Sequence, residues 1–337
     1  MKPLRDRPLR IGTRGSPLAL AQAHEVRDRL QAAHPALRAE GATEVVILST
    51  RGDRILDRPL AEIGGKGLFT EEIEAALLDG SLDLAVHSMK DMPTALPSGL
   101  HLPCLLPRED PRDVLLWRAN LALDPEATAR GDWLAALPRG ARVGTSSLRR
   151  AAQVLAARPD LQISGFRGNV GSRMRKLEAG EADATLLARA GLRRLGIDVG
   201  ALLATEALLP AVAQGAIGVE CRVGDAETEA LLQAIACPAT RRAVSAERAM
   251  LAALEGSCRT PIAGLCEPIA GGLRLRGLVA SEDGKRMVRA EATATLAAPP
   301  DLGSTEDDTI ALGAAEALGA RVAALLRDAS AALQGGG

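Results

Sequence analysis

Short apolar runs recur along the chain as far as about residue 220, and amphipathic segments lie between them. Nearly continuous apolar runs of this length are typical of strands that are buried on both faces of a parallel sheet. They predict strands over 10–13, 44–48, 82–86 and 100–106. Capping residues and apolar stripes predict helices over 17–33 and from 71 to about 79. This alternation of strands and helices favours an α/β fold.

The sequence pattern of the first hundred residues is repeated further along the chain. Residues 142–145 (Arg-Val-Gly-Thr) resemble 10–13 (Arg-Ile-Gly-Thr), and each copy precedes a serine and a helix. Residues 180–187 resemble 80–87 in the same way. The similarities are short, and chance is the alternative explanation. Together they predict two similar α/β lobes that face each other across a cleft, which is where ligands usually bind.

The linking segments indicate where the chain passes between domains. Residues 107–113 are polar and contain two prolines, which is typical of a domain crossing. Residues 211–220 are punctuated by glycine and predict a strand that returns to the first lobe. Beyond residue 238 the pattern changes to helices and alternating strands. We expect domain 1 at 8–106 and 216–236, domain 2 at 112–210, and domain 3 at 238–333.

The C-terminal third predicts a small antiparallel α+β domain. Residues 240–254 form an amphipathic pattern, and 273–280 and 286–295 alternate as strands do. Ser-Glu-Asp-Gly between these two strands is a hairpin signal. Residues 309–333 are rich in Ala and Leu and predict a long helix.

Composition narrows the class of protein. The 337 residues carry a formal net charge of −1, with two Phe, two Trp and no Tyr. This balance argues against a broad nucleic-acid footprint and against base-stacking platforms. The polar, basic N-terminus is not a secretory signal, and we expect no apolar run that spans a bilayer. We therefore expect a cytoplasmic protein with neither nucleic acid nor membrane as a partner. The sequence does not give the oligomeric state; our expectation is a monomer.

Cysteine and histidine spacing predicts neither a disulfide framework nor a metal site. The five cysteines are odd in number, widely spaced and without a CxxC pair. The four histidines form no HExxH motif. The residues concerned are Cys104, Cys221, Cys237, Cys258 and Cys266, and His24, His34, His87 and His101.

Charged residues follow the predicted strand at 82–86, where Lys90 and Asp91 stand side by side. In open α/β sheets, ligands bind beyond the carboxyl ends of the strands. A cation and a carboxylate at this place suit a charged substrate. The alternative is a solvated surface ion pair, which contributes little.

Basic residues gather near predicted loops and helix starts, including the Ser16-Pro17 helix start. Arginine makes bidentate bonds to carboxylates and phosphates, and helix N-termini add backbone donors. These residues predict a cationic cleft that binds a polyanion of the polycarboxylate class; the alternative is that they lie on solvated helix faces. The set is Arg14, Lys66, Lys90, Arg149, Arg150, Arg167, Arg173 and Arg194.

Cys258 differs from the other cysteines because it lies in a loop of small residues just beyond a predicted helix. The neighbouring Arg259 favours its thiolate form. A lone loop cysteine is usually not catalytic, and no Cys–His pairing is visible in the sequence.

From about residue 9 to residue 268, and more loosely to the C-terminus, the sequence resembles the porphobilinogen deaminase (hydroxymethylbilane synthase) family. The motifs that carry the resemblance are 12–20, 64–69, 85–93, 144–150, 167–173 and 255–261. The resemblance implies two doubly wound lobes like those of periplasmic binding proteins. It also implies a small α+β C-terminal domain, with a three-stranded antiparallel sheet, that carries the cysteine.

The resemblance also implies a reaction. A dipyrromethane cofactor is held by Cys258 through a thioether, and four porphobilinogen units add to it head to tail. Each addition loses ammonia and forms an electrophilic azafulvene, which the terminal pyrrole carbon attacks. Water finally releases the linear tetrapyrrole hydroxymethylbilane, and the cofactor stays on the protein.

Site roles follow from the same resemblance. Asp91 matches the family's catalytic aspartate, which stabilises positive pyrrole nitrogens, and Lys90 is assigned to catalysis and to cofactor binding. The other residues assigned to the cofactor are Cys258, Thr145, Ser147, Arg149 and Arg150. The residues assigned to the substrate are Arg14, Ser16, Lys66, Arg167, Arg173 and Arg194.

Two positions depart from the family's pattern. Glu62 stands where some relatives have Lys, and Arg189 interrupts a stretch that is usually small and apolar. The competing function is a non-catalytic, two-lobed module that binds polycarboxylates. That module would explain the repeated lobes and the arginines, but it would not explain Cys258 in a third domain.

Overall fold

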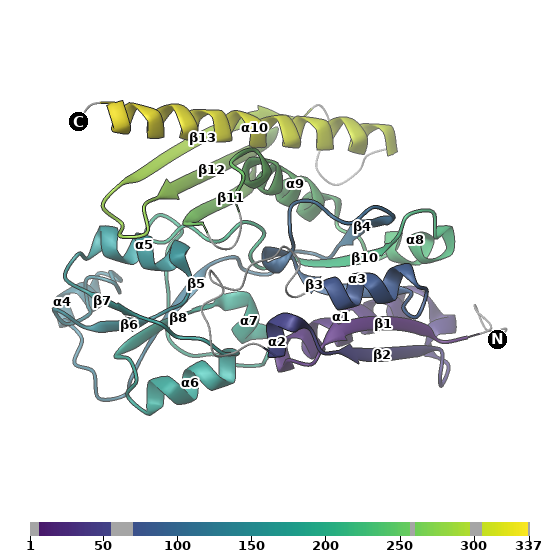
Figure 1. Ribbon diagram of the computed structural model, residues 1–337, viewed down its shortest axis with the longest axis horizontal. Helices are drawn as coiled ribbons and strands as arrows, with labels where there is room; N and C mark the ends of the chain where they lie inside the picture. The colour runs from purple at the N-terminus through teal and green to yellow at the C-terminus, as the bar shows by residue number, and fades with distance from the viewer. Residues whose placement is uncertain (1–6, 55–69, 257–259, 297–304, 336–337) are drawn as a thin grey trace. The chain divides into compact units, whose positions relative to one another are not determined.

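The computed structural model describes residues 7–54, 70–256, 260–296 and 305–335 (Figure 1). The chain forms two compact units. Unit 1 consists of Met1–Glu109 and Ala216–Arg241, and unit 2 consists of Asp110–Gly215 and Arg242–Gly337. The three-domain boundaries expected from the sequence remain a prediction.

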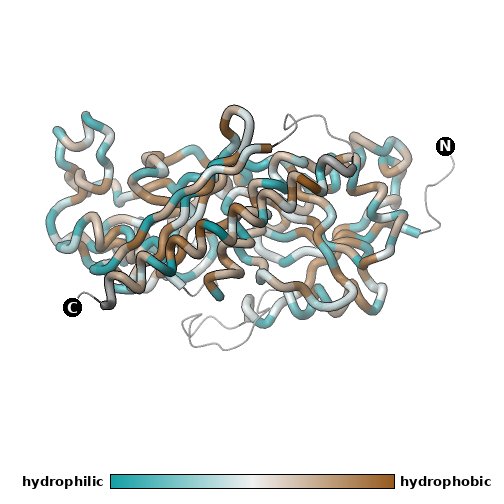
Figure 2. The backbone as a smooth tube through the Cα atoms, turned by 90° about the horizontal axis from the view of Figure 1, so that it is seen from above, coloured by the Kyte–Doolittle hydropathy of each residue, from teal (hydrophilic) through white to brown (hydrophobic). Residues whose placement is uncertain are grey.

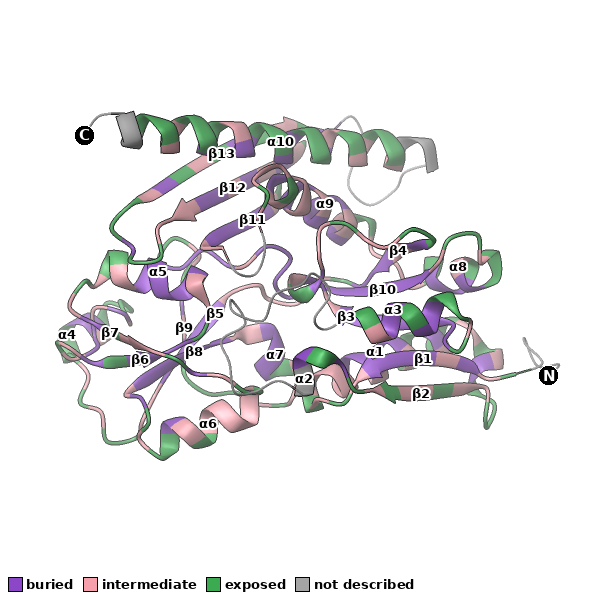
Figure 3. Cartoon of the chain, in the orientation of Figure 1, coloured by how far each residue is buried: buried purple, intermediate pink, exposed green. Residues whose placement is uncertain are grey.

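Unit 1 is built on a five-stranded sheet with the order β2-β1-β3-β10-β4. β1 pairs in parallel with β2 and β3, whereas β10 runs antiparallel to both β3 and β4. β10 therefore returns to the first sheet, as the sequence predicted. β3 and β10 are buried along most of their length (Figure 3). The strands are β1 (Leu9–Arg14), β2 (Thr43–Leu48), β3 (Leu84–Ser88), β4 (Leu100–Leu105) and β10 (Ile217–Arg222).

The two helices that the sequence predicted in unit 1, α1 (Pro17–Ala33) and α3 (Glu71–Leu78), begin where expected. The Ser16 hydroxyl accepts a hydrogen bond from the Ala19 amide at 3.2 Å and caps α1. Thr70 stands at the N-cap position of α3, but its side chain makes no capping hydrogen bond. Three glutamates in the first turn of α3 still complement the positive end of the helix dipole. The helices are α1 (Pro17–Ala33), η1 (Pro35–Arg38), α2 (Arg51–Arg54), α3 (Glu71–Leu78), η2 (Met89–Asp91) and α8 (Ala226–Gln233).

Unit 2 contains a second five-stranded sheet, with the order β7-β6-β8-β5-β9. β6 pairs in parallel with β7 and β8, whereas β5 runs antiparallel to β8 and β9. The strands are β5 (Asp113–Trp117), β6 (Arg142–Gly144), β7 (Gln162–Ser164), β8 (Ala184–Ala188) and β9 (Ala201–Leu202). The helices are α4 (Pro125–Ala129), α5 (Leu148–Ala157), α6 (Val170–Glu178) and α7 (Arg189–Arg194).

The two sheets confirm the repeat that was predicted from the sequence. An aspartate before the third parallel strand binds the start of the first strand in both copies. Asp83 Oδ2 accepts from the Arg10 amide at 2.8 Å, and Asp183 Oδ2 accepts from the Arg142 amide at 2.8 Å. In both copies the arginine side chain also donates to a glycine carbonyl, that of Gly80 or Gly180. The matching aspartate, arginine and glycine residues therefore make the same hydrogen bonds in the two sheets.

A separate three-stranded antiparallel sheet, β11-β12-β13, forms the C-terminal domain within unit 2. The sequence pattern predicted the hairpin of β12 (Gly272–Ala280) and β13 (Met287–Thr295), whereas the third strand, β11 (Ile262–Ile269), was implied only by the family resemblance and without a position. α9 (Pro238–Ala253) and α10 (Thr305–Gly335) complete this domain. Gly319 allows α10 to approach α9 closely, because a Cβ atom there would lie 2.3 Å from the Ala246 carbonyl oxygen.

α10 lies along the C-terminal sheet (Figure 1) and contacts β12 and β13. Apolar residues recur along it (Figure 2), and its buried residues include Ala315, Leu318, Val322 and Leu326. Their spacing places them on one helical face. By length and composition alone, Asp308–Ala332 is also apolar enough to cross a membrane, contrary to the expectation that the chain contains no such segment.

Candidate functional site

A pocket in unit 1 lies at the carboxyl ends of two neighbouring parallel strands. β1 ends at Arg14 and β3 at Ser88, and η2 follows β3 directly. The pocket is lined by Arg14, Ser16, Ser88 and Asp91, among others. The structure therefore brings together three residues that the sequence singled out: a cation, a hydroxyl and a carboxylate. Lys90 lies beside Asp91 in η2.

Sequence reasoning missed the polar residues that support this pocket. Gln22 is only 4% exposed, and its amide donates to the Ser88 hydroxyl at 2.8 Å. His87 Nε2 lies 3.0 Å from the Glu220 Oε2 atom, and both side chains are buried. Gln22 on the buried face of α1 and Glu220 in a buried strand were visible as polar residues in apolar patterns. Such residues are usually retained for a hydrogen bond.

Residues at the start of α5 in unit 2 form a second polar group. The buried Thr145 hydroxyl accepts from the Ser147 amide at 3.2 Å. Ser147 is the N-cap of α5, and its hydroxyl accepts from the Arg150 amide at 3.4 Å. Hydroxyls and backbone donors at a helix start suit an anionic ligand.

Arg149 and Arg150 follow on the first turn of α5, but they are not the open cleft cations that the sequence predicted. Both are only 5% exposed. Arg149 Nη2 lies 2.8 Å from Asp113 Oδ2, and Arg150 Nη2 lies 2.7 Å from Asp113 Oδ1. Their Nη1 atoms donate to the carbonyls of Leu209 and Leu186 at 2.7 and 2.9 Å. Asp113 begins β5, so the neighbouring strand supplies the counter-charge.

The electrostatics of this buried cluster leave a surplus of positive charge. Burial alone would raise the pKa of Asp113, but the two guanidinium groups outweigh it and hold that pKa well below its usual range. Gln214 Nε2 also donates to Asp113 Oδ1 at 3.0 Å. The Nε atoms of Arg149 and Arg150 are buried without a hydrogen-bond partner among the described residues. Two cations and one carboxylate make a group suited to a further carboxylate.

The remaining predicted arginines of unit 2 occupy loop and helix ends, and all three are partly exposed. Arg167 lies in the loop between β7 and α6. Arg173 Nε donates to the Gly168 carbonyl at 2.8 Å. Arg194, the last residue of α7, donates to the Gly215 carbonyl at 3.1 Å. The structure gives these residues fixed positions within unit 2.

Three positions of interest lie outside the described residues: Lys66, Cys258 and Glu62. The other departure, Arg189, is accommodated because its Nη1 atom lies 2.7 Å from Asp198 Oδ1. The remaining cysteines are free thiols, of which Cys104, Cys221 and Cys266 are buried. Burial raises the pKa of Cys104 to about 12, as expected for an inert core thiol.

Comparisons with known proteins cover nearly the whole chain. Residues 9–230 match the family description "Porphobilinogen deaminase, dipyromethane cofactor binding domain", and 241–328 match "Porphobilinogen deaminase, C-terminal domain". Porphobilinogen deaminase of Paracoccus denitrificans is 56% identical over 287 residues, which is 84% of this chain and 87% of that protein. The chloroplastic porphobilinogen deaminase of Oryza sativa is 53% identical over 288 residues, 85% of this chain and 77% of that protein.

Solved structures also show a likeness. The periplasmic aliphatic sulphonate-binding protein SsuA of Escherichia coli aligns with 74% of this chain and 71% of its own, at 18% identity and a TM-score of 0.38. The VFT2 domain of Bordetella pertussis BvgS aligns with 68% of this chain and 86% of its own, at 18% identity and a TM-score of 0.39.

The two family descriptions and the similar enzymes name the same family. They do not favour the non-catalytic binding module as the alternative function. The family is one of transferases that carry a dipyrromethane cofactor. This chain belongs to the porphobilinogen deaminase family.

Proposed function

We propose that this chain joins four porphobilinogen molecules head to tail on a covalently bound dipyrromethane. Ammonia is lost at each addition, and hydrolysis releases the linear tetrapyrrole hydroxymethylbilane. The observation that carries the proposal is the match of residues 9–230 to a dipyrromethane-binding family domain. Within that region, Asp91, Arg14 and Ser16 line one pocket.

Asp91 is the proposed catalytic residue. β3 and the short η2 helix hold its carboxylate at the pocket. Positive charge develops on pyrrole nitrogens during the reaction, and a fixed carboxylate stabilises such charge without reorganisation. Lys90, beside it, is proposed to act with Asp91 and to bind a carboxylate arm of the cofactor.

The substrate supplies the reason for so many cations. Each porphobilinogen ring carries two carboxylates, so each addition brings two more negative charges to the protein. In unit 1, Arg14 and Ser16 are proposed to bind these arms, together with Lys66. In unit 2, the same role is proposed for Arg167, Arg173 and Arg194. Arginine suits it because its planar fork matches a carboxylate.

The proposed attachment point of the cofactor is the Cys258 sulfur, through a thioether. When bound, the dipyrromethane supplies the pyrrole carbon to which the first substrate unit is joined. Arg149 and Arg150 are proposed to act on its acidic arms from below the surface, through the net positive charge that they carry together with Asp113. Thr145 and Ser147 add hydroxyls at the same helix start. These residues orient the cofactor and neutralise its charge.

We also propose that the protein is a cytoplasmic monomer that serves tetrapyrrole biosynthesis. The family match over most of the chain supports the role in tetrapyrrole biosynthesis. Light scattering on the purified protein is expected to give the mass of a single chain, 35.0 kDa, plus that of the cofactor. A mass twice as large would rule out the monomer.

The function is tested by looking for the covalent pyrrole group. The intact mass is expected to exceed the sequence mass by one dipyrromethane, and the denatured protein should colour with an aldehyde reagent for pyrroles. Cys258→Ser should lose both signals together with turnover of porphobilinogen. Cys237→Ser, which alters another free cysteine, should keep them. A protein that binds polycarboxylates but carries no adduct would instead support the non-catalytic module.

A further inference from the structure

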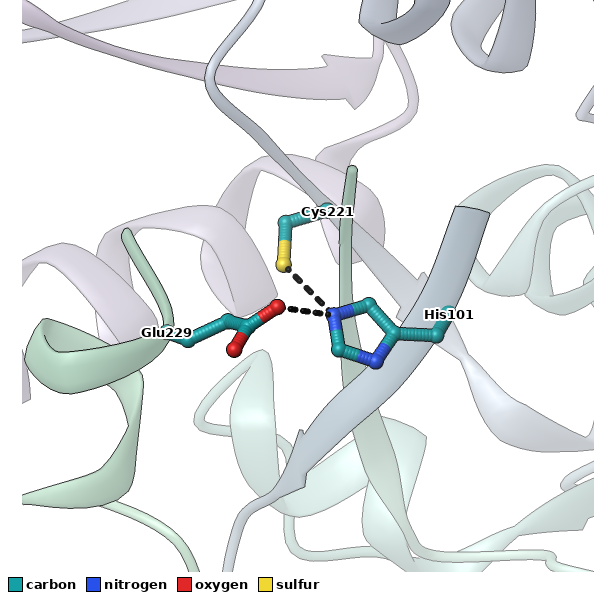
Figure 4. Close-up of side chains that lie close together, drawn as sticks. All are labelled: His101, Cys221 and Glu229. Carbon is teal, nitrogen blue, oxygen red and sulfur yellow. Dashed lines mark hydrogen bonds and ion pairs between the residues drawn. The ribbon is translucent and has the colours of Figure 1, made fainter. Parts of the chain in front are cut away.

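Three side chains of unit 1 converge away from the residues that line the pocket (Figure 4). His101 on β4 lies directly opposite Cys221 on the antiparallel strand β10. Glu229 reaches them from α8. His101 Nε2 lies 3.4 Å from Cys221 Sγ and 3.0 Å from Glu229 Oε1. Two strands and a helix therefore bring together a nitrogen, a sulfur and an oxygen.

The arrangement is not that of a nucleophile with its base. In a Cys–His–carboxylate triad, the thiol and the carboxylate bind opposite nitrogens of the imidazole ring. Here both are directed at the same atom, His101 Nε2 (Figure 4). One nitrogen offers either one N–H or one lone pair, so it serves only one of the two groups at a time. Cys221 is also fully buried, which closes it to a substrate.

We propose that His101, Cys221 and Glu229 form a binding site for a divalent transition-metal cation such as Zn²⁺. Their donor atoms all lie within 4.8 Å of one another. Zinc bonds of about 2.0–2.1 Å to nitrogen and oxygen and about 2.3 Å to sulfur place tetrahedral ligand atoms about 3.4–3.6 Å apart. The two contacts to His101 Nε2 are close to that separation, so small side-chain shifts suffice. One nitrogen, one thiolate and one carboxylate are the ligand types that zinc prefers.

Charge and access agree with this assignment. A Cys221 thiolate and the Glu229 carboxylate would together neutralise the two charges of the cation. Glu229 Oε1 also accepts from the Gly224 amide at 3.1 Å, which holds the carboxylate in place. The His101 and Glu229 side chains are about one-third exposed, at 35% and 34%, and give the ion a path to enter.

The sequence predicted no metal site because it shows no short ligand spacing. His101 and Cys221 are 120 positions apart, and only the pairing of β4 with β10 makes them neighbours. None of the three residues lines the pocket that contains Asp91. The site is therefore assigned to stabilising unit 1, by joining two strands and a helix.

The first test uses Zn²⁺ and Co²⁺ on the full-length holoenzyme after treatment with a chelator. One equivalent of Zn²⁺ should bind in competition with a chromophoric chelator. Co²⁺ should give a near-ultraviolet thiolate-to-cobalt absorption. Cys221→Ser should abolish this absorption, and Cys237→Ser should keep it. Absorption that survives in Cys221→Ser, or a holoenzyme that competes for no Zn²⁺, would overturn the proposal.

The second test replaces the two partly exposed ligands, His101 and Glu229. It does not depend on the folding of Cys221→Ser, because it leaves the buried Cys221 unchanged. His101→Gln and Glu229→Gln should each weaken Zn²⁺ binding by at least about 10- to 100-fold. That is the usual loss when a residue that only hydrogen-bonds to a metal ligand is replaced. His34→Gln is the matched control, because His34 Nε2 lies 3.0 Å from the Leu231 carbonyl oxygen and belongs to no such cluster among the described residues. Unchanged affinity in both ligand variants would contradict the site.

Discussion

At the scale of single residues, burial and pairing decide what each charged group is able to do. Asp91 reaches a pocket that also holds Arg14 and Ser16, so its carboxylate is available to a ligand. Asp113 is fully buried between two arginines, so its carboxylate is committed to the fold. In the sequence, Asp91 follows an apolar run and Asp113 precedes one. Only the structure separates their roles.

Asp91→Asn tests the catalytic role. The substitution removes the charge and keeps the shape, so the fold and the cofactor should be retained. Turnover should fall by about 10²–10³, the usual cost of removing one preorganised electrostatic partner. Steady-state assays and intact mass measure the two effects separately. Near-normal turnover in a cofactor-loaded Asp91→Asn protein would show that Asp91 has no such role.

Asp113→Ala tests the structural role. It leaves two buried guanidinium groups without a counter-charge, which should lower the free energy of unfolding by about 3–5 kcal/mol. Asp198→Ala is the control: it breaks the Arg189 pair at a carboxylate that is 87% exposed, and should cost about 1 kcal/mol or less. Denaturant titration compares the two. Equal losses would mean that the buried cluster contributes no more than a surface pair.

The ion pairs of Asp113 with Arg149 and Arg150 also determine how the stability of the protein changes with pH. The pKa of Asp113 is lower in the folded protein than in the unfolded chain. Its contribution to stability is therefore fully present above the unfolded value of about 3.9 and is lost as the pH falls through the lower folded value. The stability difference between wild type and Asp113→Ala should stay constant from pH 7 to about pH 5 and shrink only in stronger acid. A difference that shrinks near neutral pH would contradict this assignment.

At the scale of elements, the ends of strands and helices place the binding groups. β1 and β3 end beside each other, which is why residues 70 or more positions apart in sequence share a pocket. This gathering was predictable from the rule that ligands bind at carboxyl ends of strands. The burial of Arg149 and Arg150 was not predictable, because their partner lies on β5, 36 and 37 positions away. No local pattern encodes that pairing.

The arginines on different elements should act at different stages. Arg149→Leu or Arg150→Leu should impair cofactor loading or the first addition, because both lie at the proposed cofactor-binding helix start. Arg14→Leu and Arg173→Leu should load the cofactor and then stall elongation. Loss of one charged hydrogen bond costs about 1.5–3 kcal/mol, which slows a step by about one to two decades. Arg→Lys should rescue only in part, since Lys lacks the bidentate fork.

Mass spectrometry after addition of porphobilinogen counts the units on each variant and so tests the staging. Arg189→Leu is the control, because Arg189 pairs with an exposed aspartate and should complete the series. Since Arg149 and Arg150 are buried, circular dichroism must show that their variants are folded. If Arg149→Leu, Arg14→Leu and Arg173→Leu all stop at the same number of units, or none stalls, the staging is wrong.

At the scale of the whole molecule, the two similar sheets differ in where along the chain their antiparallel strand comes from. Both sheets place their antiparallel strand beside the third parallel strand. In the first sheet this strand is β10, made after the second sheet; in the second sheet it is β5, made before the rest. The repeat was readable because its motifs make the same hydrogen bonds in both copies. β11 was not readable, because Gly264 and Pro268 interrupt its apolar pattern.

This difference affects the order in which the protein is able to fold during synthesis. β4 ends at Leu105 and β10 begins at Ile217, so at about 5–20 residues per second roughly 5–20 s separate their emergence. Until then, β3 and β4 lack the neighbour that lies between them in the finished sheet. Unpaired strand edges readily pair with other chains.

Ribosome-bound chains offer a direct measurement. A chain arrested with residues 1–215 exposed should be cut by protease within unit 1, and one that also exposes 216–241 should resist; equal resistance would show that β10 is dispensable for closure. The other four strands of this sheet are therefore synthesised before β10, which begins about twice as far along the chain as the end of β4. A chaperone that shields them during that interval would raise the yield of folded protein without touching the finished enzyme.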